Sequence, residues 1–280
     1  MIFRTRFAPS PTGQLHLGHA YSALLAHDMA SAANGEFLLR IEDTDTARCR
    51  PEYETQIYAD LHWLGIHWPS PVMRQSDRLA DYNAAIQILA NRGLCYPCAC
   101  SRRDIREAIS APHGGNGANT YPGTCRHRSM ASQTDTDAIR LDIAKALNAY
   151  PNIAQATFSD TGPEHAGTHG LTQTHLLGEI GDIVLARRDI KTASYHLAAV
   201  IDDAAQGINQ IIRGEDLFQS TFIQIILQNL LGLPTPSYHH HALITDDAGM
   251  RLAKRTDAQS LETLRQNGAT PQSIRQQLGL

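Results

Sequence analysis

Two histidines near the start of the chain have the spacing of an anion-binding helix terminus. His16 and His19 follow the turn-forming residues 9–13, and Gly18 lies between them. Residues three apart share one face of a helix, so both imidazole rings can donate hydrogen bonds to one phosphate group. The first turn of a helix also presents unpaired N–H groups and the positive end of the helix dipole. The segment therefore predicts a phosphate-binding site; the alternative is a helix cap that carries two exposed histidines.

A second basic segment, residues 250–255, lies far along the chain. It contains Arg251 and Lys254 and follows a predicted turn at residues 246–249. Lys254 is one of only three lysines among 24 basic residues. Arginine forms planar, two-pronged contacts with phosphate, whereas lysine acts as a compact point charge. An isolated basic segment is most often a solvated face, but together with the histidine segment it predicts a loop that supplies a cation to a phosphate chain.

The elements around the histidine segment predict a parallel α/β sheet. Residues 4–7 are expected to form a strand, apolar residues at helical spacing predict a helix over residues 17–33, and residues 37–41 predict a buried strand. Ligands bind at the carboxyl ends of the strands in such doubly wound sheets, which is where the histidines would lie. Further helices are expected over residues 52–64 and 78–92.

From about Leu94 the sequence changes character. Cysteines, glycines and short strand-like pieces at residues 138–143 and 183–186 replace the long helices, which predicts a smaller α+β domain inserted into the sheet domain. The α/β pattern then resumes. Strands are expected near residues 195–201, 208–212 and 239–244, and a helix over residues 220–231.

These patterns divide the chain into four predicted parts. Residues 1–94 and 194–260 are the two halves of a Rossmann-type parallel-sheet catalytic domain. Residues 95–193 form the inserted α+β domain, and residues 261–280 form a short helical tail.

The composition favours a folded protein. Of the 280 residues, 42% are hydrophobic and 19% are charged, which excludes a disordered chain. The sequence has no run of about 18 apolar residues, and its first residues lack the apolar core of a signal peptide. We therefore expect a cytoplasmic protein without membrane association. A formal charge of −4 also excludes a polycation that binds nucleic acid along its whole length.

Three of the five cysteines lie close together in the sequence: Cys98, Cys100 and Cys125. An odd number of cysteines suits a reducing compartment with a metal site better than a disulfide framework. A structural zinc ion takes four ligands in a tetrahedron, so three thiolates leave one position to fill. The candidates for that position are Tyr121, His113 and His127. The alternative is a group of reduced, buried cysteines.

The segments RFAPSPTGQLHLGH (residues 6–19) and RLAKR (residues 251–255) resemble, in this order, the two signatures of class I aminoacyl-tRNA synthetases. The resemblance implies a Rossmann core that binds ATP, with Mg²⁺ neutralising part of the phosphate charge. It assigns catalytic roles to His16, His19 and Lys254, with Gly18 and Arg251 as further ATP-binding residues. The loop departs from the family pattern, because Ala253 stands where a polar residue such as Ser is usual and Arg251 replaces its first Lys. Loss of that hydroxyl costs about 1 kcal/mol.

Three segments are similar to the glutamyl-tRNA synthetase branch: RFAPSPTGQLHLGHAYSAL (residues 6–24), LLRIEDTD (residues 38–45) and GINQIIRGEDL (residues 207–217). Glutamate carries one ammonium and two carboxylates, so Arg6 and Arg213 can bind carboxylate groups and Glu42 the ammonium. The alternatives are that Glu42 is an ordinary exposed acid and that Arg213 pairs with Glu215 at a strand end. The resemblance implies the full set of glutamate-binding residues: Arg6, Ala8, Ser10, Glu42, Tyr195 and Arg213.

The sequence stops at Leu280, where bacterial glutamyl-tRNA synthetases continue into a helical domain that reads the anticodon. We therefore expect no anticodon-binding domain and a resemblance to the glutamyl-Q tRNA(Asp) synthetase family. This implies tRNA-independent activation of L-glutamate by ATP, followed by transfer to the queuosine base at the wobble position of tRNA(Asp). The anticodon loop would be the RNA partner, contacted by arginines such as Arg102, Arg103, Arg187 and Arg188.

The same family carries a CxC…YxxxC pattern, which implies one structural zinc ion held by Cys98, Cys100, Tyr121 and Cys125. We expect a monomer. Two other functions fit the motifs less completely. One is a glutamyl-tRNA synthetase that charges tRNA(Glu) without an anticodon domain, and the other is a non-catalytic regulator that binds RNA or protein.

Replacing the lysine of the second signature tests the ATP-binding hypothesis. We expect Lys254→Ala to lower glutamate-dependent ATP–pyrophosphate exchange on the order of 100-fold, because a cation on the developing phosphate charge is lost. Near-normal exchange in this variant would contradict the assignment.

Overall fold

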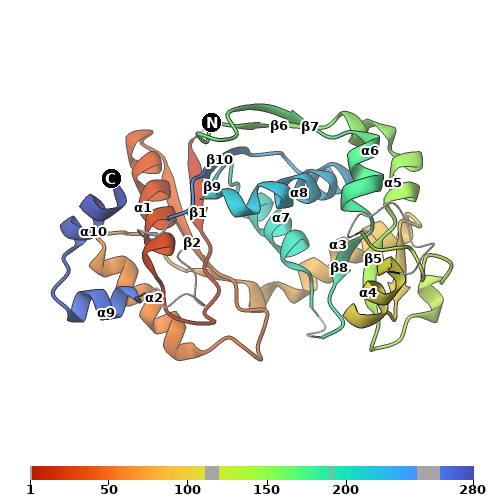
Figure 1. Cartoon of the computed structure of the whole chain (residues 1–280), viewed down its shortest axis with the longest axis horizontal. Coiled ribbons are helices and arrows are strands. Elements are labelled where there is room, and N and C mark those ends of the chain that lie inside the picture. The colour runs from red at the N-terminus through yellow and green to blue at the C-terminus, as the bar shows by residue number, and fades with distance from the viewer. Residues whose placement is uncertain (1, 111–119, 190–191, 245–258) are drawn as a thin grey trace.

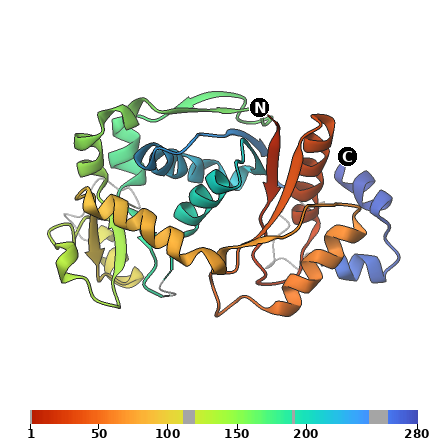
Figure 2. The same cartoon turned by 180° about the vertical axis from the view of Figure 1, so that it is seen from behind.

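The computed structural model of the chain describes residues 2–110, 120–189, 192–244 and 259–280. Figures 1 and 2 show an elongated molecule, in which the N-terminal strands and the C-terminal helices lie at one end. A small sheet around β5 and β8 lies at the other end, and helices α7 and α8 lie between them. Over the described ranges, the structure contains no helix with the length and apolar character needed to cross a bilayer.

The N-terminal strands form a parallel sheet in the order β1-β2-β3. Its strands are β1 (Arg4–Phe7), β2 (Glu36–Ile41) and β3 (Met73–Arg74). Helix α1 (Leu17–Ala32) connects β1 to β2, and α2 (Pro51–Trp63) lies between β2 and β3. The predicted strand–helix–strand unit is confirmed.

A second sheet has the order β7-β6-β10-β9. Strand β10 (Ser237–His241) pairs in parallel with both β9 (Gln210–Gly214) and β6 (Thr157–Asp160), and β7 (Gly167–Gly170) is antiparallel to β6. The two sheets meet where β1 lies beside β9, because the Asn209 N–H donates to the Arg4 carbonyl oxygen at 3.1 Å. The carboxyl ends of β1 and β9 therefore open on the same side of the molecule.

The strand predicted near residues 195–201 is wrong, because this segment is helix α7 (Tyr195–Ala205). Its apolar residues are buried on most sides, so the sequence shows neither helical nor strand periodicity. Two local features favour the helix: a run rich in alanine, and Ser194, whose side chain accepts a hydrogen bond from the Leu197 N–H as an N-cap. Helix α8 (Phe218–Leu231) follows β9, as expected.

The middle of the chain forms an antiparallel sheet in the order β4-β5-β8, with strands β4 (Cys95–Cys98), β5 (Ala138–Leu141) and β8 (Ile183–Ala186). Helices α3 (Leu79–Asn91), α4 (Arg102–Ser110) and α5 (Ile143–Ala149) accompany it. One buried apolar cluster joins this sheet to α3, α7 and α8, and β6 and β7 belong to the second sheet. The domain boundaries expected from the sequence therefore stay predictions.

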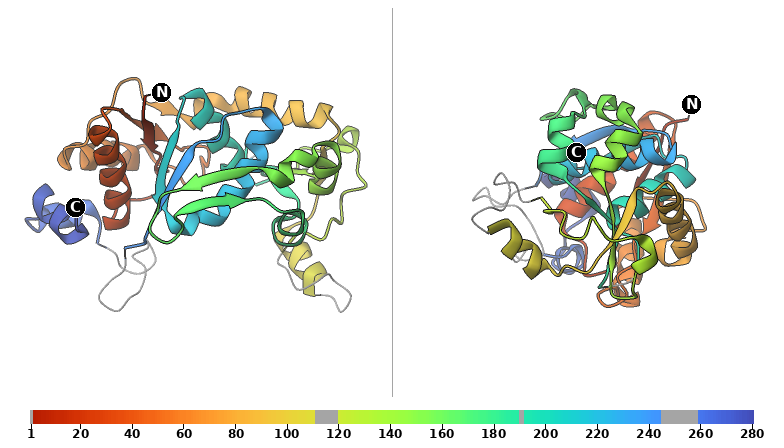
Figure 3. Two further views of the ribbon diagram at one scale, coloured as in Figure 1. Left: turned by 90° about the horizontal axis from the view of Figure 1, so that it is seen from above. Right: turned by 90° about the vertical axis from the view of Figure 1, so that its right-hand side faces the viewer.

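The C-terminal helices α9 (Leu261–Gln266) and α10 (Pro271–Leu278) lie on the outer side of α1, at the end of the molecule that contains the N-terminal sheet (Figure 3). Ile274 is buried in the same cluster as α1, and Arg275 pairs with Asp28 of α1 at 2.6 Å. The remaining short helical segments are η1 (Gln75–Arg78), η2 (Met130–Ser132), η3 (Pro151–Gln155), α6 (Gln173–His175), η4 (Leu176–Ile180) and η5 (Glu215–Leu217).

Candidate active site

A cavity of about 250 Å³ opens at the carboxyl ends of β1 and β9. Its lining residues come from residues 6–42 and from residues 195–244. Ser10, by contrast, is exposed and does not line the cavity. Arg251 and Lys254 lie outside the described residues. The sequence-predicted residues that line the cavity are Arg6, Ala8, His16, Gly18, His19, Glu42, Tyr195 and Arg213.

His16 and His19 form a reciprocal cap at the N-terminus of α1. The His16 Nδ1 atom accepts a hydrogen bond from the Gly18 N–H at 3.1 Å, and the His19 Nδ1 atom accepts one from the His16 N–H at 3.2 Å. The ring centroids are 3.8 Å apart. Because each Nδ1 accepts, each neutral ring carries its proton on Nε2. These hydrogen bonds agree with the alternative prediction of a helix cap. Both rings also line the cavity.

Gly18 lies directly beside the His16 ring of this cap. A Cβ atom at residue 18 would lie 3.1 Å from Cε1 and 3.2 Å from Nδ1 of His16. Glycine at this position therefore leaves room for the capping ring.

A buried charge network holds the other side of the cavity. Asp203 of α7 accepts hydrogen bonds from Arg6 Nε at 3.0 Å and from Arg40 Nη1 at 2.7 Å. Arg40 Nη2 also donates to Glu42 Oε1 at 3.2 Å. The Glu42 side chain is 9% exposed, so the alternative of an ordinary surface acid is wrong.

The two carboxylates of this network respond differently to burial. Burial raises the pKa of Asp203, but the charges of Arg6 and Arg40 outweigh it and lower the pKa below its ordinary value. For Glu42, burial outweighs the attraction of Arg40 and Arg6, and the pKa is raised. The sequence motifs do not single out Arg40 or Asp203. Arg40 lies inside the segment LLRIEDTD, and Asp203 follows the apolar run of residues 195–201.

Arg213 is a buried cation of a different kind. It is 5% exposed, and its partners are neutral: His240 Nε2 at 3.1 Å, Thr221 Oγ1 at 2.7 Å, the Leu217 carbonyl oxygen at 3.4 Å and the Tyr195 hydroxyl at 3.5 Å. Within residues 2–110, 120–189, 192–244 and 259–280, no carboxylate forms an ion pair with Arg213. The alternative expected from the sequence, a pair between Arg213 and Glu215, is therefore wrong. A buried charge without a counter-ion is costly, so this side of the cavity favours an anionic ligand.

His241 and Ser22 also line the cavity and were not predicted. His241 lies at the carboxyl end of β10, and its Nε2 atom is 2.7 Å from Ser22 Oγ. The strand predicted over residues 239–244 could have indicated His241, since side chains at the carboxyl end of a parallel strand face the ligand side. The strand in fact ends at His241.

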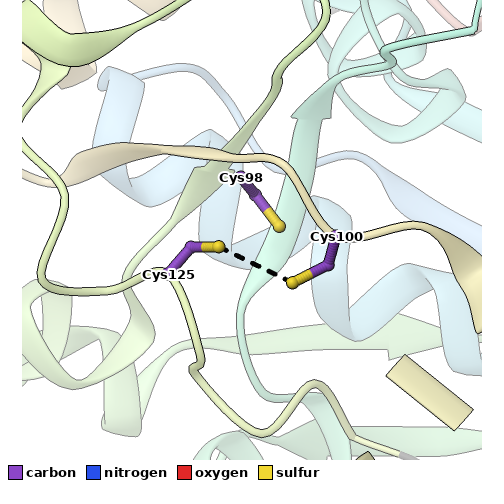
Figure 4. Close-up of side chains that lie close together, drawn as sticks. All are labelled: Cys98, Cys100 and Cys125. Carbon is purple, nitrogen blue, oxygen red and sulfur yellow. Dashed lines mark hydrogen bonds between the residues drawn. The ribbon is translucent and has the colours of Figure 1, made fainter. Parts of the chain in front are cut away.

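The three clustered cysteines converge between β4 and the segment that follows α4 (Figure 4). Their sulfur atoms all lie within 4.8 Å of one another, and Cys100 Sγ is 3.6 Å from Cys125 Sγ. Sulfur atoms of a tetrahedral zinc–thiolate site, with bonds of about 2.3 Å, lie about 3.8 Å apart. The cluster thus has the dimensions of a metal site.

Tyr121 is placed where a fourth ligand would lie. Its hydroxyl oxygen is 3.3 Å from Cys98 Sγ and 3.4 Å from Cys100 Sγ. His127 is exposed and outside the cluster, and His113 lies outside the described residues. Burial raises the pKa of Cys125, but hydrogen bonds from the Tyr121 hydroxyl and the Ala99 backbone outweigh it and lower the pKa to about 7. Burial raises the pKa of Cys100 to about 11, so it is the spacing of the three sulfur atoms that fits a metal ion that binds thiolates.

The family model described as "tRNA synthetases class I (E and Q), catalytic domain" matches residues 2–280. The chain belongs to this family. The resemblance stated from the two signatures is thereby confirmed at the level of the class.

Relatives within the class share a more specific name. A protein of Rhodobacter capsulatus named glutamyl-Q tRNA(Asp) synthetase is 52% identical, and the alignment covers 99% of each chain. Proteins of the same name from Nocardia farcinica and Nitratidesulfovibrio vulgaris are 43% and 38% identical, over 96% and 98% of this chain and 81% and 84% of theirs. The resemblance to the glutamyl-Q tRNA(Asp) synthetase family is confirmed.

The fold is also that of solved glutamate–tRNA ligases. The ligase of Elizabethkingia meningosepticum, solved in complex with its amino acid, has a TM-score of 0.78 at 26% identity. The enzyme of Elizabethkingia anophelis has the same TM-score at 25% identity. Each match covers all of this chain and 61% of the ligase chain.

Removing the shared carboxylate tests the charge network. We expect Asp203→Asn to lower the free energy of unfolding by about 3 kcal/mol at pH 7, because two buried arginines lose their partner. The folded-state pKa of Asp203 lies below its ordinary 3.8, so its contribution is complete above that pH and is lost as the pH falls through the folded-state value. Urea denaturation should show the difference from wild type shrinking below a pH of about 4; a difference that does not depend on pH would contradict this account.

Proposed function

We propose that this protein activates L-glutamate with ATP in the absence of tRNA and transfers the glutamyl group to the queuosine base of tRNA(Asp). The observation that carries the proposal is a single cavity with two chemistries. The N-terminus of α1 contributes two histidine donors to it, and a buried arginine with no carboxylate partner among the described residues lines the same cavity. The names of the most similar relatives support the same substrates.

In the first step, the α-carboxylate of glutamate attacks the α-phosphorus of ATP. A carboxyl O–P bond forms, the bond from the α-phosphorus to the bridging oxygen breaks, and pyrophosphate leaves. The Nε2–H groups of His16 and His19 donate to phosphate oxygens, and the N-terminus of α1 adds the positive end of the helix dipole. Lys254 is proposed to bind the leaving phosphates on the resemblance of residues 251–255 alone. Mg²⁺, as in other reactions of nucleoside triphosphates, would neutralise part of the phosphate charge.

Glutamate is proposed to bind at the Arg213 side of the cavity. Arg213 attracts a carboxylate because its own partners leave its charge uncompensated. The Tyr195 hydroxyl, 3.5 Å from Arg213 Nη1, adds a directional hydrogen bond. Glu42 accepts the ammonium group, while Arg6, oriented by Asp203, donates hydrogen bonds to the second carboxylate. Ala8 lines the same cavity, whereas the role of Ser10 rests on resemblance alone.

In the second step, a hydroxyl of the queuosine cyclopentene ring attacks the activated carbonyl, an ester forms and AMP leaves. RNA phosphates are proposed to bind in a hollow of about 530 Å³ beside the cysteine cluster, which Arg102, Arg187 and Arg188 help to line. Arg187 also lies 3.8 Å from Asp45, which is three residues after Glu42 in the sequence. Arg187 is also paired with Asp189 at 2.6 Å, and Arg103 is paired with Glu107 at 2.7 Å.

An acceptor assay tests the proposed function. Labelled glutamate and ATP are supplied with queuosine-containing tRNA(Asp), with the same tRNA lacking queuosine, and with tRNA(Glu). We expect label on the first RNA only, released by mild base and mapped to the wobble nucleotide. Label on tRNA(Glu) alone would favour the tRNA(Glu)-charging alternative, and the absence of glutamate-dependent pyrophosphate exchange would favour a non-catalytic regulator.

One zinc ion is proposed to bind Cys98, Cys100, Cys125 and Tyr121, where it would link β4 to residues 121–125. We expect about one zinc per chain by mass spectrometry of the purified protein. Cys125→Ser should lose the metal and lower the thermal unfolding midpoint, and Tyr121→Phe should weaken binding without abolishing it. Cys49→Ser is the matched control, since Cys49 lies outside the cluster. Full zinc content in Cys125→Ser would contradict the proposal.

A further inference from the structure

The orientation of Arg213 depends on two buried residues that have no place in the reaction described above. We propose that Asp160 and His240 are positioning residues, which fix the guanidinium of Arg213 for binding the carboxylate of the amino acid substrate. This inference rests on the proposed function, because it assigns to Arg213 the role of a carboxylate-binding residue.

The hydrogen bonds determine the tautomer of His240. Arg213 Nε carries one hydrogen and can only donate, so His240 Nε2, at 3.1 Å, must accept. The ring proton of neutral His240 is then on Nδ1, which donates to Asp160 Oδ2. Both side chains of this pair are fully buried. Burial, followed by the charge of Arg213, lowers the pKa of His240 to about 4, so the ring is neutral at pH 7.

Asp160 itself cannot turn. Its other oxygen, Oδ1, accepts hydrogen bonds from the Gly162 N–H at 2.7 Å and from the His240 N–H at 3.3 Å. Gly162 allows this close approach, since a Cβ atom there would lie 1.9 Å from the His240 carbonyl oxygen. The two backbone donors therefore hold Oδ1, and Oδ2 faces the ring.

The remaining contacts of Arg213 complete its orientation. Nη2 donates to Thr221 Oγ1 and to the Leu217 carbonyl oxygen, so Nε and Nη2 are both held by neutral acceptors. Nη1 lies beside the Tyr195 hydroxyl at the cavity. The arrangement fixes the plane of the guanidinium without neutralising it, because the charge of Asp160 is separated from Arg213 by a neutral ring.

A purely structural role for the pair makes a different prediction. The His240 ring packs against Phe218 and Tyr238, with centroids at 5.3 and 5.7 Å. If the pair served only this packing, its loss would lower stability and affect the use of ATP and glutamate alike. A positioning role affects the KM for glutamate selectively.

Asp160→Asn is the most informative variant because it is isosteric. The Gly162 and His240 N–H groups require an oxygen at the Oδ1 position, so the amide NH₂ faces His240 Nδ1. That ring atom must then accept, the ring proton moves to Nε2, and Nε2–H faces the Arg213 Nε–H. We expect the KM for glutamate in pyrophosphate exchange to rise on the order of tenfold, with kcat within about threefold and the KM for ATP unchanged.

A pair of histidine variants separates the two ends of the ring. In His240→Gln the amide oxygen can replace Nε2 as the acceptor for Arg213, whereas in His240→Asn the shorter amide can reach Asp160 only. We expect the glutamate KM of His240→Gln to lie closer to wild type than that of His240→Asn. His239→Asn is the matched control, because its ring contacts Thr161 and does not line the cavity.

The outcomes are distinguishable. Equal changes in the KM values for glutamate and ATP, or an unchanged glutamate KM in Asp160→Asn, would overturn the positioning role. So would a His240→Asn variant that binds glutamate as well as His240→Gln does. Absence of glutamate-dependent exchange in the wild-type protein would instead overturn the proposed function itself.

Discussion

The constraint on which this molecule depends is the burial of positive charge between two adjoining sheets. Arg6, Arg40 and Arg213 all lie in the interior, where an unpaired charge is expensive. The first two share Asp203, and Arg40 also contacts Glu42, so that group is close to neutral. Arg213 has only neutral partners among the described residues, and the cavity gains an attraction for anions there. Because Arg213 and the N-terminus of α1 line the same cavity, two groups that favour anions share one small space.

Much of the site could be predicted from sequence because its residues come from short local motifs. The spacing of His16 and His19 specifies a shared helical face, and a motif at the end of a parallel strand must lie at the ligand side of the sheet. Arg6, Glu42 and Arg213 each follow this logic, at the ends of β1, β2 and β9. The cysteine spacing likewise predicted a cluster, and the structure brings those sulfur atoms together.

What could not be predicted depends on contacts between distant segments. The apolar run of helix α7 is buried on most sides, so its periodicity does not distinguish a helix from the strand that the sequence predicts there. Asp203 lies on that helix, so its role could not be inferred once the element was assigned wrongly. Asp160 is 80 residues from His240 in the sequence, and only the pairing of β6 with β10 makes them neighbours.

Strand β6 also affects how the middle of the chain could be exchanged between relatives. It lies among residues assigned by sequence to an insertion, yet it adds a strand to the sheet that contains β9 and β10. A graft that replaces this middle portion would therefore also replace Asp160, the carboxylate that contacts His240 beside Arg213. Chimeras that change the portion around the cysteine cluster while preserving the surroundings of Arg213 would need their junctions placed so that the β6–β7 hairpin stays with β9 and β10.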